Sequence, residues 1–280
     1  MALLARIARL ALINTLSTKP VGDLESKVVV SLTTHGARSN TVYLAIESIA
    51  CGHVKPNRLI LWIDDLQLLD RLPRSLRRLE ARGLEIQHAC NYGPHTKYYG
   101  YVAAEKAPRL PLVTADDDIL YPMRWLEGLV ASFREHPSDV HCYRARVVVL
   151  GPGGEFAAYS SWPFCTSTRA SILNFATGVS GVLYPCAVLD EVRSAGLGFQ
   201  QYSPFNDDIW LHRATIRAGA RIRQIDGSPV HFCQIPGTER SALWTSDNGI
   251  TRNDEQIRAT YGPAELELLR SASEKQLEEK

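Results

Sequence analysis

The sequence lacks several features that would assign it to a class at once. Its six cysteines are scattered and form no CxxC pair, which argues against a zinc knuckle and against a disulfide scaffold. We expect most of them to be buried thiols in a reducing compartment. The net charge of the 280-residue chain is only +1, with no clustered basic excess, so we expect no nucleic-acid partner. Internal repeats and low-complexity segments are also missing, and the composition is that of an ordinary globular protein.

The chain also lacks an apolar run long enough to cross a bilayer. Residues 1–14 are apolar, but Arg6 and Arg9 interrupt them and no clear signal cleavage site follows. Two interpretations remain open. The segment is a helix on a membrane surface with its arginines toward lipid phosphates, or a helix packed on the domain or on a partner. We expect a cytoplasmic protein, which the first interpretation places on the inner face of the membrane.

Strands and helices alternate in the first half. After a polar linker at residues 15–26, β-branched and apolar runs predict strands at residues 27–34, 58–63, 84–87 and 110–114. Apolar spacing and helix-stop signals predict helices at 40–51, 73–82 and 95–107. This alternation predicts a mostly parallel sheet with helices on both faces, and ligands at the carboxyl ends of its strands.

The second half is less regular. We expect helices at residues 125–135, 186–194 and 205–219, and strands at 141–150 and 221–225. Gly151–Gly154 predicts a hairpin turn, and residues 177–185 read as a glycine-bearing loop that runs into a short strand. Residues 235–254 are polar and are interpreted as a loop that could act as a lid. The tail from Ala264 is charged and helix-prone.

Three consecutive carboxylates, Asp116–Asp118, directly follow the predicted strand at 110–114. They could form a solvated acidic turn, or they could bind Mg²⁺ or Mn²⁺, which prefer oxygen ligands. Polar pairs also end the first two strands, at Thr33–Thr34 and Asp64–Asp65, and an acidic pair at Asp207–Asp208 opens a later helix. This agreement favours the metal site. In an extended segment, Asp117 would point away from its two neighbours.

These features, in this order, carry a resemblance to a known family. The features are the strand at Val28–Thr34, the carboxylates after the second strand, the DxD motif and the helix that begins Asn206-Asp207-Asp208. With them, residues 27–232 resemble a GT-A fold, nucleotide-sugar-dependent glycosyltransferase of the family 2 type. The resemblance implies a Rossmann-like α/β fold with a mostly parallel sheet, in a single domain with a smaller acceptor-binding half. The expected divisions are an N-terminal segment and linker (1–26), a nucleotide-binding half (27–122), a donor-sugar and acceptor half (123–235) and a C-terminal loop and tail (236–280).

The resemblance also implies ligands and roles. The donor would be a nucleotide sugar, most simply a UDP-sugar, and the acceptor a glycan or glycolipid, as in polysaccharide biosynthesis. Asp118 would bind Mn²⁺ or Mg²⁺ directly, while Asp116 would contact the ribose or the metal. A late histidine, His231, is a second candidate metal ligand, although a lone histidine is as often a structural residue.

An inverting enzyme of this kind needs a base for the acceptor hydroxyl, and the resemblance places it at Asp208, with Asp207 as the second choice. A helix N-terminus would weaken this base, whereas burial and the neighbouring carboxylate would strengthen it. Asn206 or Asp207 could instead only cap the helix.

The remaining expected contacts fall into two groups. Nucleotide contacts are expected from Thr33, Arg38, Asp64, Asp65 and Lys97, and donor-sugar or acceptor contacts from Gly178, Gly181 and Trp244. Two other classes stay open. A metal-dependent nucleotidyltransferase is less favoured, because the loop after the first strand has one glycine and one arginine where a triphosphate-binding loop needs more. The third class is a non-catalytic nucleotide- or sugar-binding protein.

Overall fold

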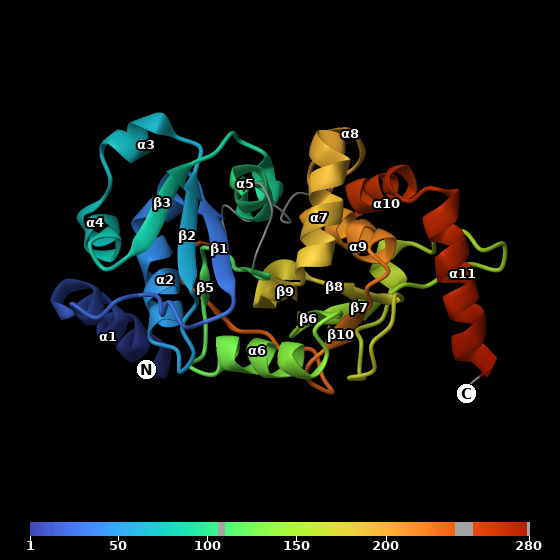
Figure 1. Ribbon diagram of the computed structural model, residues 1–280, viewed down its shortest axis with the longest axis horizontal. Coiled ribbons are helices and arrows are strands. Elements are labelled where there is room, and N and C mark those ends of the chain that lie inside the picture. Colours follow the sequence, from blue (N-terminus) through green and yellow to red (C-terminus); the bar gives the residue numbers. More distant parts are fainter. Residues whose placement is uncertain (106–109, 239–248, 279–280) are drawn as a thin grey trace.

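The computed structural model describes residues 1–105, 110–238 and 249–278. Its centre is a seven-stranded sheet (Figure 1). The strand order is β10 (Ile222–Gln224), β6 (Val140–Cys142), β9 (Val182–Tyr184), β4 (Leu112–Thr114), β1 (Val29–Thr34), β2 (Arg58–Ile63), β3 (Leu84–His88). Only β9 runs antiparallel to its neighbours, β4 and β6. The mostly parallel α/β sheet predicted from the sequence is therefore confirmed.

Helices cover both faces of this sheet. One face packs against α5 (Thr96–Ala104), α7 (Cys186–Ala195) and α9 (Asp207–Arg217), and the other against α2 (Val42–Ala50), α4 (Arg74–Glu80) and α6 (Trp125–Glu135). In β1 the alternation is direct: Val29 belongs to the first apolar cluster, while Val30 and Leu32 belong to the second. Such strands are apolar on both faces, which is why the run at 27–34 reads as continuous.

The order of the central strands places the ligand site. The chain passes from β1 to β2 on one side and later returns to pair β4 with β1 on the other. The strand order thus reverses direction beside β1, and in open α/β sheets ligands bind at the carboxyl ends of the strands at such a point. Thr34, at the end of β1, and Asp116–Asp118, after β4, lie there.

The long strand predicted at 141–150 is wrong. The chain leaves the main sheet after β6, and β7 (Ala145–Val147) pairs with β8 (Asn174–Ala176) in a separate two-stranded sheet. A bridge between Leu150 and Phe156 still closes the turn expected near residue 153. The break at Tyr143–Arg144 matters for the site, because it brings Arg144 to the pocket rather than to a sheet face.

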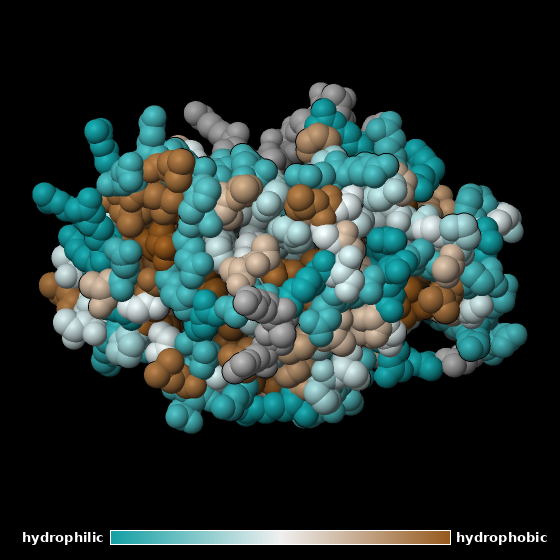
Figure 2. Space-filling model, turned by 45° about the horizontal axis from the view of Figure 1, so that its top comes forward, coloured by the Kyte–Doolittle hydropathy of each residue, from teal (hydrophilic) through white to brown (hydrophobic). Residues whose placement is uncertain are grey.

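Further short elements were not predicted. α3 (Leu66–Asp70) follows β2, and β5 (Ile119–Leu120) pairs antiparallel with β11 (Cys233–Gln234), which fixes the segment after the acidic triplet. The 3-10 turn η1 (Gly36–Asn40) follows β1, and the one-turn helix α8 (Phe199–Tyr202) precedes α9. Figure 2 shows a largely hydrophilic face with separate apolar patches.

The C-terminal part is more helical than expected. α10 (Gly249–Thr260) begins inside the predicted loop at 235–254, and α11 (Pro263–Glu278) follows it, so the loop assignment is wrong from residue 249 onward. Residues 239–248 of that loop, including Trp244, lie outside the described residues. Both helices contact α9, and Ile257 of α10, Leu269 of α11 and Tyr261 between the two helices complete an apolar cluster around Trp162 and Phe175.

The N-terminal helix α1 (Ala2–Leu16) packs on the domain. Leu10 is buried, and Asn14 donates to Glu47 Oε1 at 3.0 Å. Arg6 turns inward and donates to the carbonyl of Tyr121 at 2.6 Å, so it does not face outward as the membrane interpretation required. The opposite side of α1 exposes Leu4, Leu12 and Leu16. No described helix is long and apolar enough to span a membrane.

Candidate functional site

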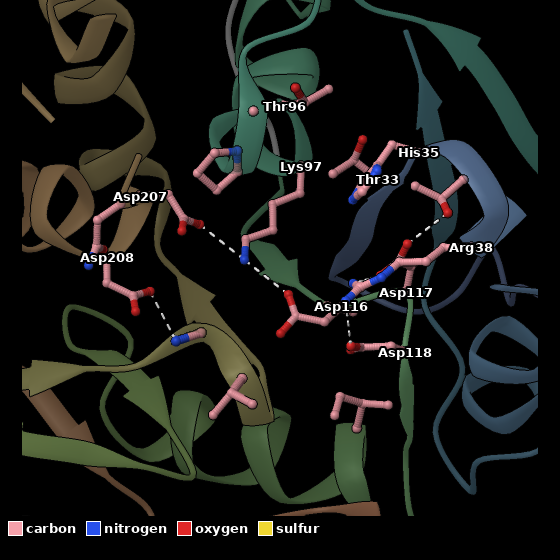
Figure 3. A pocket seen from close by; sticks show the side chains of 18 of the residues that line it. Thr33, His35, Arg38, Thr96, Lys97, Asp116, Asp117, Asp118, Asp207 and Asp208 are labelled. Carbon is pink, nitrogen blue, oxygen red and sulfur yellow. Dashed lines mark hydrogen bonds and ion pairs between the residues drawn. The ribbon is translucent and has the colours of Figure 1, made fainter. Parts of the chain in front are cut away.

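A cavity of about 900 Å³ opens at the carboxyl ends of β1, β2 and β4, and its lining comes from both halves of the chain (Figure 3). Most residues singled out in the sequence line it. They are Thr33, Arg38, Asp64, Lys97, Asp116, Asp117, Asp118, Gly178, Asp207, Asp208 and His231. The structure therefore brings the acidic triplet and the later acidic pair, about ninety residues apart, to one site.

The acidic triplet is held by the loop after β1. Thr34 Oγ1 donates to Asp117 Oδ2 at 2.7 Å, and the Arg38 guanidinium lies 2.8 Å from Asp117 Oδ1 and 3.1 Å from Asp118 Oδ2. The expectation that Asp117 points away is wrong, because Asp117 and Asp118 form a turn in which the alternation of an extended strand does not apply. Asp117 anchors Arg38 and is not a bystander.

Lys97, on α5, connects the two acidic groups. Its Nζ lies 3.0 Å from Asp116 Oδ1 and also 3.0 Å from Asp207 Oδ2, the second contact being an ion pair without the alignment of a hydrogen bond (Figure 3). The lysine is 8% exposed. Burial alone would lower the pKa of Lys97, but Asp116, Asp207 and Asp208 outweigh it and hold that pKa well above the usual range.

Among the described residues, no lysine or arginine forms an ion pair with Asp208. Asn206 caps α9 by accepting from the backbone N–H of Ile209, so the following carboxylates are free for other contacts. Asp208 Oδ1 accepts the backbone N–H of Gly178 at 3.0 Å. A Cβ at Gly178 would lie 3.1 Å from that oxygen and 3.2 Å from Lys97 Nζ, so glycine permits this close approach.

Burial and neighbouring charges raise the pKa values of three carboxyl groups in the pocket. Burial, and then repulsion from Asp207, raises the pKa of Asp208 to about 8. Burial raises the pKa of Asp116 against the opposing Lys97, and burial together with repulsion from Asp116 raises the pKa of Asp118 against the opposing Arg38. A buried carboxyl group with a pKa near neutral is suited to proton transfer.

Asp116 and Asp118 also suit a divalent cation. Asp116 Oδ2 and Asp118 Oδ1 accept no hydrogen bond from the described residues, and burial together with neighbouring carboxylates destabilises the charged form of both side chains. Mg²⁺ and Mn²⁺ commonly use one or two carboxylates and complete their coordination with phosphate and water. The described residues contain no cluster of three or more histidine, cysteine or acidic ligands, so any such ion would depend on substrate oxygens.

Three predicted residues make contacts other than those expected, and a fourth lies outside the described residues. His231 lines the cavity, but its Nε2 faces Arg144 Nε at 3.0 Å, which gives that nitrogen a hydrogen-bond donor as its neighbour. Asp65 caps α3 by accepting from the N–H groups of Gln67 and Leu68, and it does not line the cavity.

Gly181 has a positive φ of 88°, and a Cβ there would lie 2.6 Å from the Trp125 ring, so packing explains it. Trp244 lies outside the described residues.

Sequence reasoning missed two pocket arginines, Arg144 and Arg146, and also Gln234, which donates to Asp118 Oδ2 at 2.9 Å. The arginines fell inside a segment interpreted as one long strand, and neither was given a role there. The only available signal was their i,i+2 spacing, which places two cations on the same side of an extended chain.

No protein-family model and no curated protein sequence matches this chain. Among solved structures, it is similar to a mannosyltransferase from Pyrobaculum calidifontis in complex with GDP-mannose and Mn²⁺, with a TM-score of 0.52 and 12% identity over 96% of this chain and 76% of the other. A second similar structure is a CMP:2-keto-3-deoxy-manno-octonic acid synthetase complexed with CTP, with a TM-score of 0.44 and 14% identity over 78% of this chain and 97% of that one. The first likeness establishes the fold alone, a mixed α/β fold of the kind found in nucleotide-sugar transferases, and the second carries no argument at this TM-score.

Proposed function

We propose that this protein is a metal-dependent glycosyltransferase that transfers a sugar from a nucleotide donor, most simply a UDP-sugar, to a glycan or glycolipid. One observation carries the proposal. Two groups of carboxylates face one cavity, and Asp208 among them combines a pKa of about 8 with a backbone N–H as its one hydrogen-bond partner among the described residues. Glycosyl transfer needs one side of the site to stabilise the negative charge of the departing diphosphate and the other side to carry a base.

The donor side is the carboxyl end of β1, β2 and β4. Thr33 and Asp64 lie at strand ends where a nucleoside would reach them, and Arg38 and Lys97 bring cations to the place proposed for the diphosphate. Asp116 and Asp118 would hold Mn²⁺ or Mg²⁺, which supplies positive charge to the departing diphosphate. His231 is given no metal-binding role in this proposal, because Arg144 faces it.

The basic side is the start of α9. Asp208 takes the proton of an acceptor hydroxyl as the oxygen bonds to the anomeric carbon and the bond from that carbon to the diphosphate breaks. Asp207 is neutralised by Lys97, so a single base remains for attack from the face opposite the leaving group. The proposed outcome is inversion at the anomeric carbon.

A lipid-linked acceptor would suit peripheral association with a membrane, which we propose for α1. Leu4, Leu12 and Leu16 are 58–69% exposed on its outer side, next to the exposed Arg9 and close to α4, whose Arg78 donates to Asn14. A surface helix with exposed leucines and no acidic residue suits an anionic lipid surface.

The membrane proposal can be tested by co-sedimentation with vesicles. The double variant L12S/L16S should lose most pelleting with phosphatidylglycerol vesicles, whereas L268S, at a leucine 50% exposed on α11, should not. Equal pelleting of the wild type and L12S/L16S would rule out this role of α1.

The proposed function is tested by thermal shift and turnover together. UDP with Mn²⁺ should raise the melting temperature of the wild type and of D208N alike, because ligands that bind the native state stabilise it. Transfer or hydrolysis of the UDP-sugar should fall about 10²–10⁴-fold in D208N. The matched control is D190N, at an exposed aspartate on α7.

Other results would favour the other classes. Stabilisation by CTP or another nucleoside triphosphate, with release of pyrophosphate, would favour a nucleotidyltransferase. Binding of UDP without any turnover of a nucleotide sugar would favour a binding protein. No stabilisation by any nucleotide or nucleotide sugar would contradict the proposed function.

A further inference from the structure

Two arginines line the cavity on the side of Asp208 and take no part in the proposed chemistry. Arg144 follows β6, and Arg146 lies in β7. Both guanidinium groups pack on the ring of Phe164, at 4.7 Å for Arg144 and 4.6 Å for Arg146, and Arg146 also lies 5.1 Å from the Tyr159 ring. Such stacking fixes the planes of both groups before any ligand arrives.

The hydrogen bonds of these arginines go to neutral groups. Arg144 contacts His231 Nε2 at 3.0 Å and Thr177 Oγ1 at 2.7 Å, and Arg146 donates to the carbonyl of Trp162. Within the described part of the chain, neither forms an ion pair with a carboxylate. Arg38 and Lys97, in the same cavity, each pair with two carboxylates.

This difference has an energetic meaning. Burial lowers the pKa of Arg144, the direction expected where desolvation acts on a cation without a close anion. A partly buried cation is stabilised when an anion completes its hydrogen bonds, and paired guanidinium groups match the oxygens of phosphate and carboxylate. The pair is therefore arranged for an anionic ligand.

The position of the pair indicates which substrate carries that anion. Thr177, which contacts Arg144, directly precedes Gly178, whose N–H binds Asp208. Asp208 is also among the charges that act on Arg144. The arginines thus lie beside the proposed base, whereas the donor side already has Arg38 and Lys97.

We propose that Arg144 and Arg146 bind an anionic group of the acceptor, a phosphate or a carboxylate, so that the enzyme selects phosphorylated or acidic sugars. The assignment of this anion to the acceptor rests on the proposed function. The binding of an anion by the two arginines does not.

Direct binding measurements test it. By calorimetry, glucose 6-phosphate or glucuronic acid should bind the wild-type protein at least about tenfold more tightly than glucose, since hydrogen bonds between charged groups contribute that much. The two anions separate the phosphate source from the carboxylate source. In R144Q/R146Q the preference should disappear, while R134Q, at an exposed arginine on α6, should keep it.

A second titration, of UDP with Mn²⁺, separates this inference from the proposed function. R144Q/R146Q should bind UDP within about twofold of the wild type. A loss of UDP affinity of about tenfold or more would place the pair on the donor diphosphate and overturn the inference, as would equal binding of glucose and both anions. If the wild type prefers the anions but does not bind UDP, the anion site stands and the proposed function fails.

Discussion

The pocket contains two groups of aspartates, Asp116–Asp118 after β4 and Asp207–Asp208 at the start of α9, and their surroundings differ. After β4, Asp117 and Asp118 face Arg38, and Asp116 faces Lys97. At the start of α9, Lys97 reaches Asp207, and within the part of the chain that the structure describes the hydrogen-bond partner of Asp208 is the Gly178 N–H. The first group pairs with cations, and the second leaves one carboxyl group able to exchange a proton. Two neighbouring aspartates in one helix turn thereby acquire different chemistry.

The substitution expected to have the largest effect is K97M, because Lys97 is shared by both groups. Its removal leaves Asp116 and Asp207 buried without their cation, and breaking a buried pair in this way typically costs about 3–5 kcal/mol. Urea unfolding should show a loss of this size for K97M and a loss below about 1 kcal/mol for K55M, whose lysine is at the surface and donates only to a carbonyl. Equal stability of K97M and the wild type would mean that the carboxylates do not depend on Lys97.

A substitution at the proposed metal site should change the affinity for the nucleotide, which a substitution of the proposed base should leave intact. D118N removes one proposed metal ligand, so the affinity for UDP measured with Mn²⁺ should fall about 10–100-fold, a range typical of weakened metal sites. Without metal, D118N and the wild type should bind UDP equally. D208N should keep the metal-dependent affinity. If D118N and D208N lose the same affinity, the proposed division of roles is wrong.

The pH dependence should report the basic side. The pKa of Asp208 is raised to about 8, so the ionised base becomes more abundant as the pH rises from 6 to 8. The value of kcat/KM should increase up to about tenfold per pH unit in that range and level off above pH 8. UDP binding with Mn²⁺, measured over the same range, controls for effects on the donor side. A flat kcat/KM between pH 6 and 9 would contradict the assignment of Asp208 as the base.

How far the sequence predicts this arrangement depends on the region. The β-branched run of β1, the acidic turn after β4 and the Asn-capped start of α9 are local patterns, so the sheet and both carboxylate groups could be predicted. The pairing of Arg38 with Asp117 and Asp118, and of Lys97 with Asp207, depends on tertiary contacts across 79 to 110 residues, which no local pattern encodes. Arg144 and Arg146 were missed for the same reason, because the break between β6 and β7 follows from the small sheet that β7 forms with β8.

The smallest expected effect is on stability, and its sign is opposite to that on activity. In the folded protein the pKa of Asp208 is about 8, against 3.8 for the free side chain, so the folded state holds its proton more tightly than the unfolded state. The stability due to the protonated carboxyl group is complete below about pH 4 and is lost as the pH rises through 8. An asparagine resembles the protonated form at every pH. D208N should therefore unfold at a higher temperature than the wild type, with a gain that grows by about 1 kcal/mol per pH unit from pH 6 and levels off above pH 8. D190N, at an exposed site, should show no such trend. A D208N variant no more stable than the wild type at pH 9 would show that Asp208 is not held in a strained, basic state, and the contrast between the two carboxylate groups would then rest on metal binding alone.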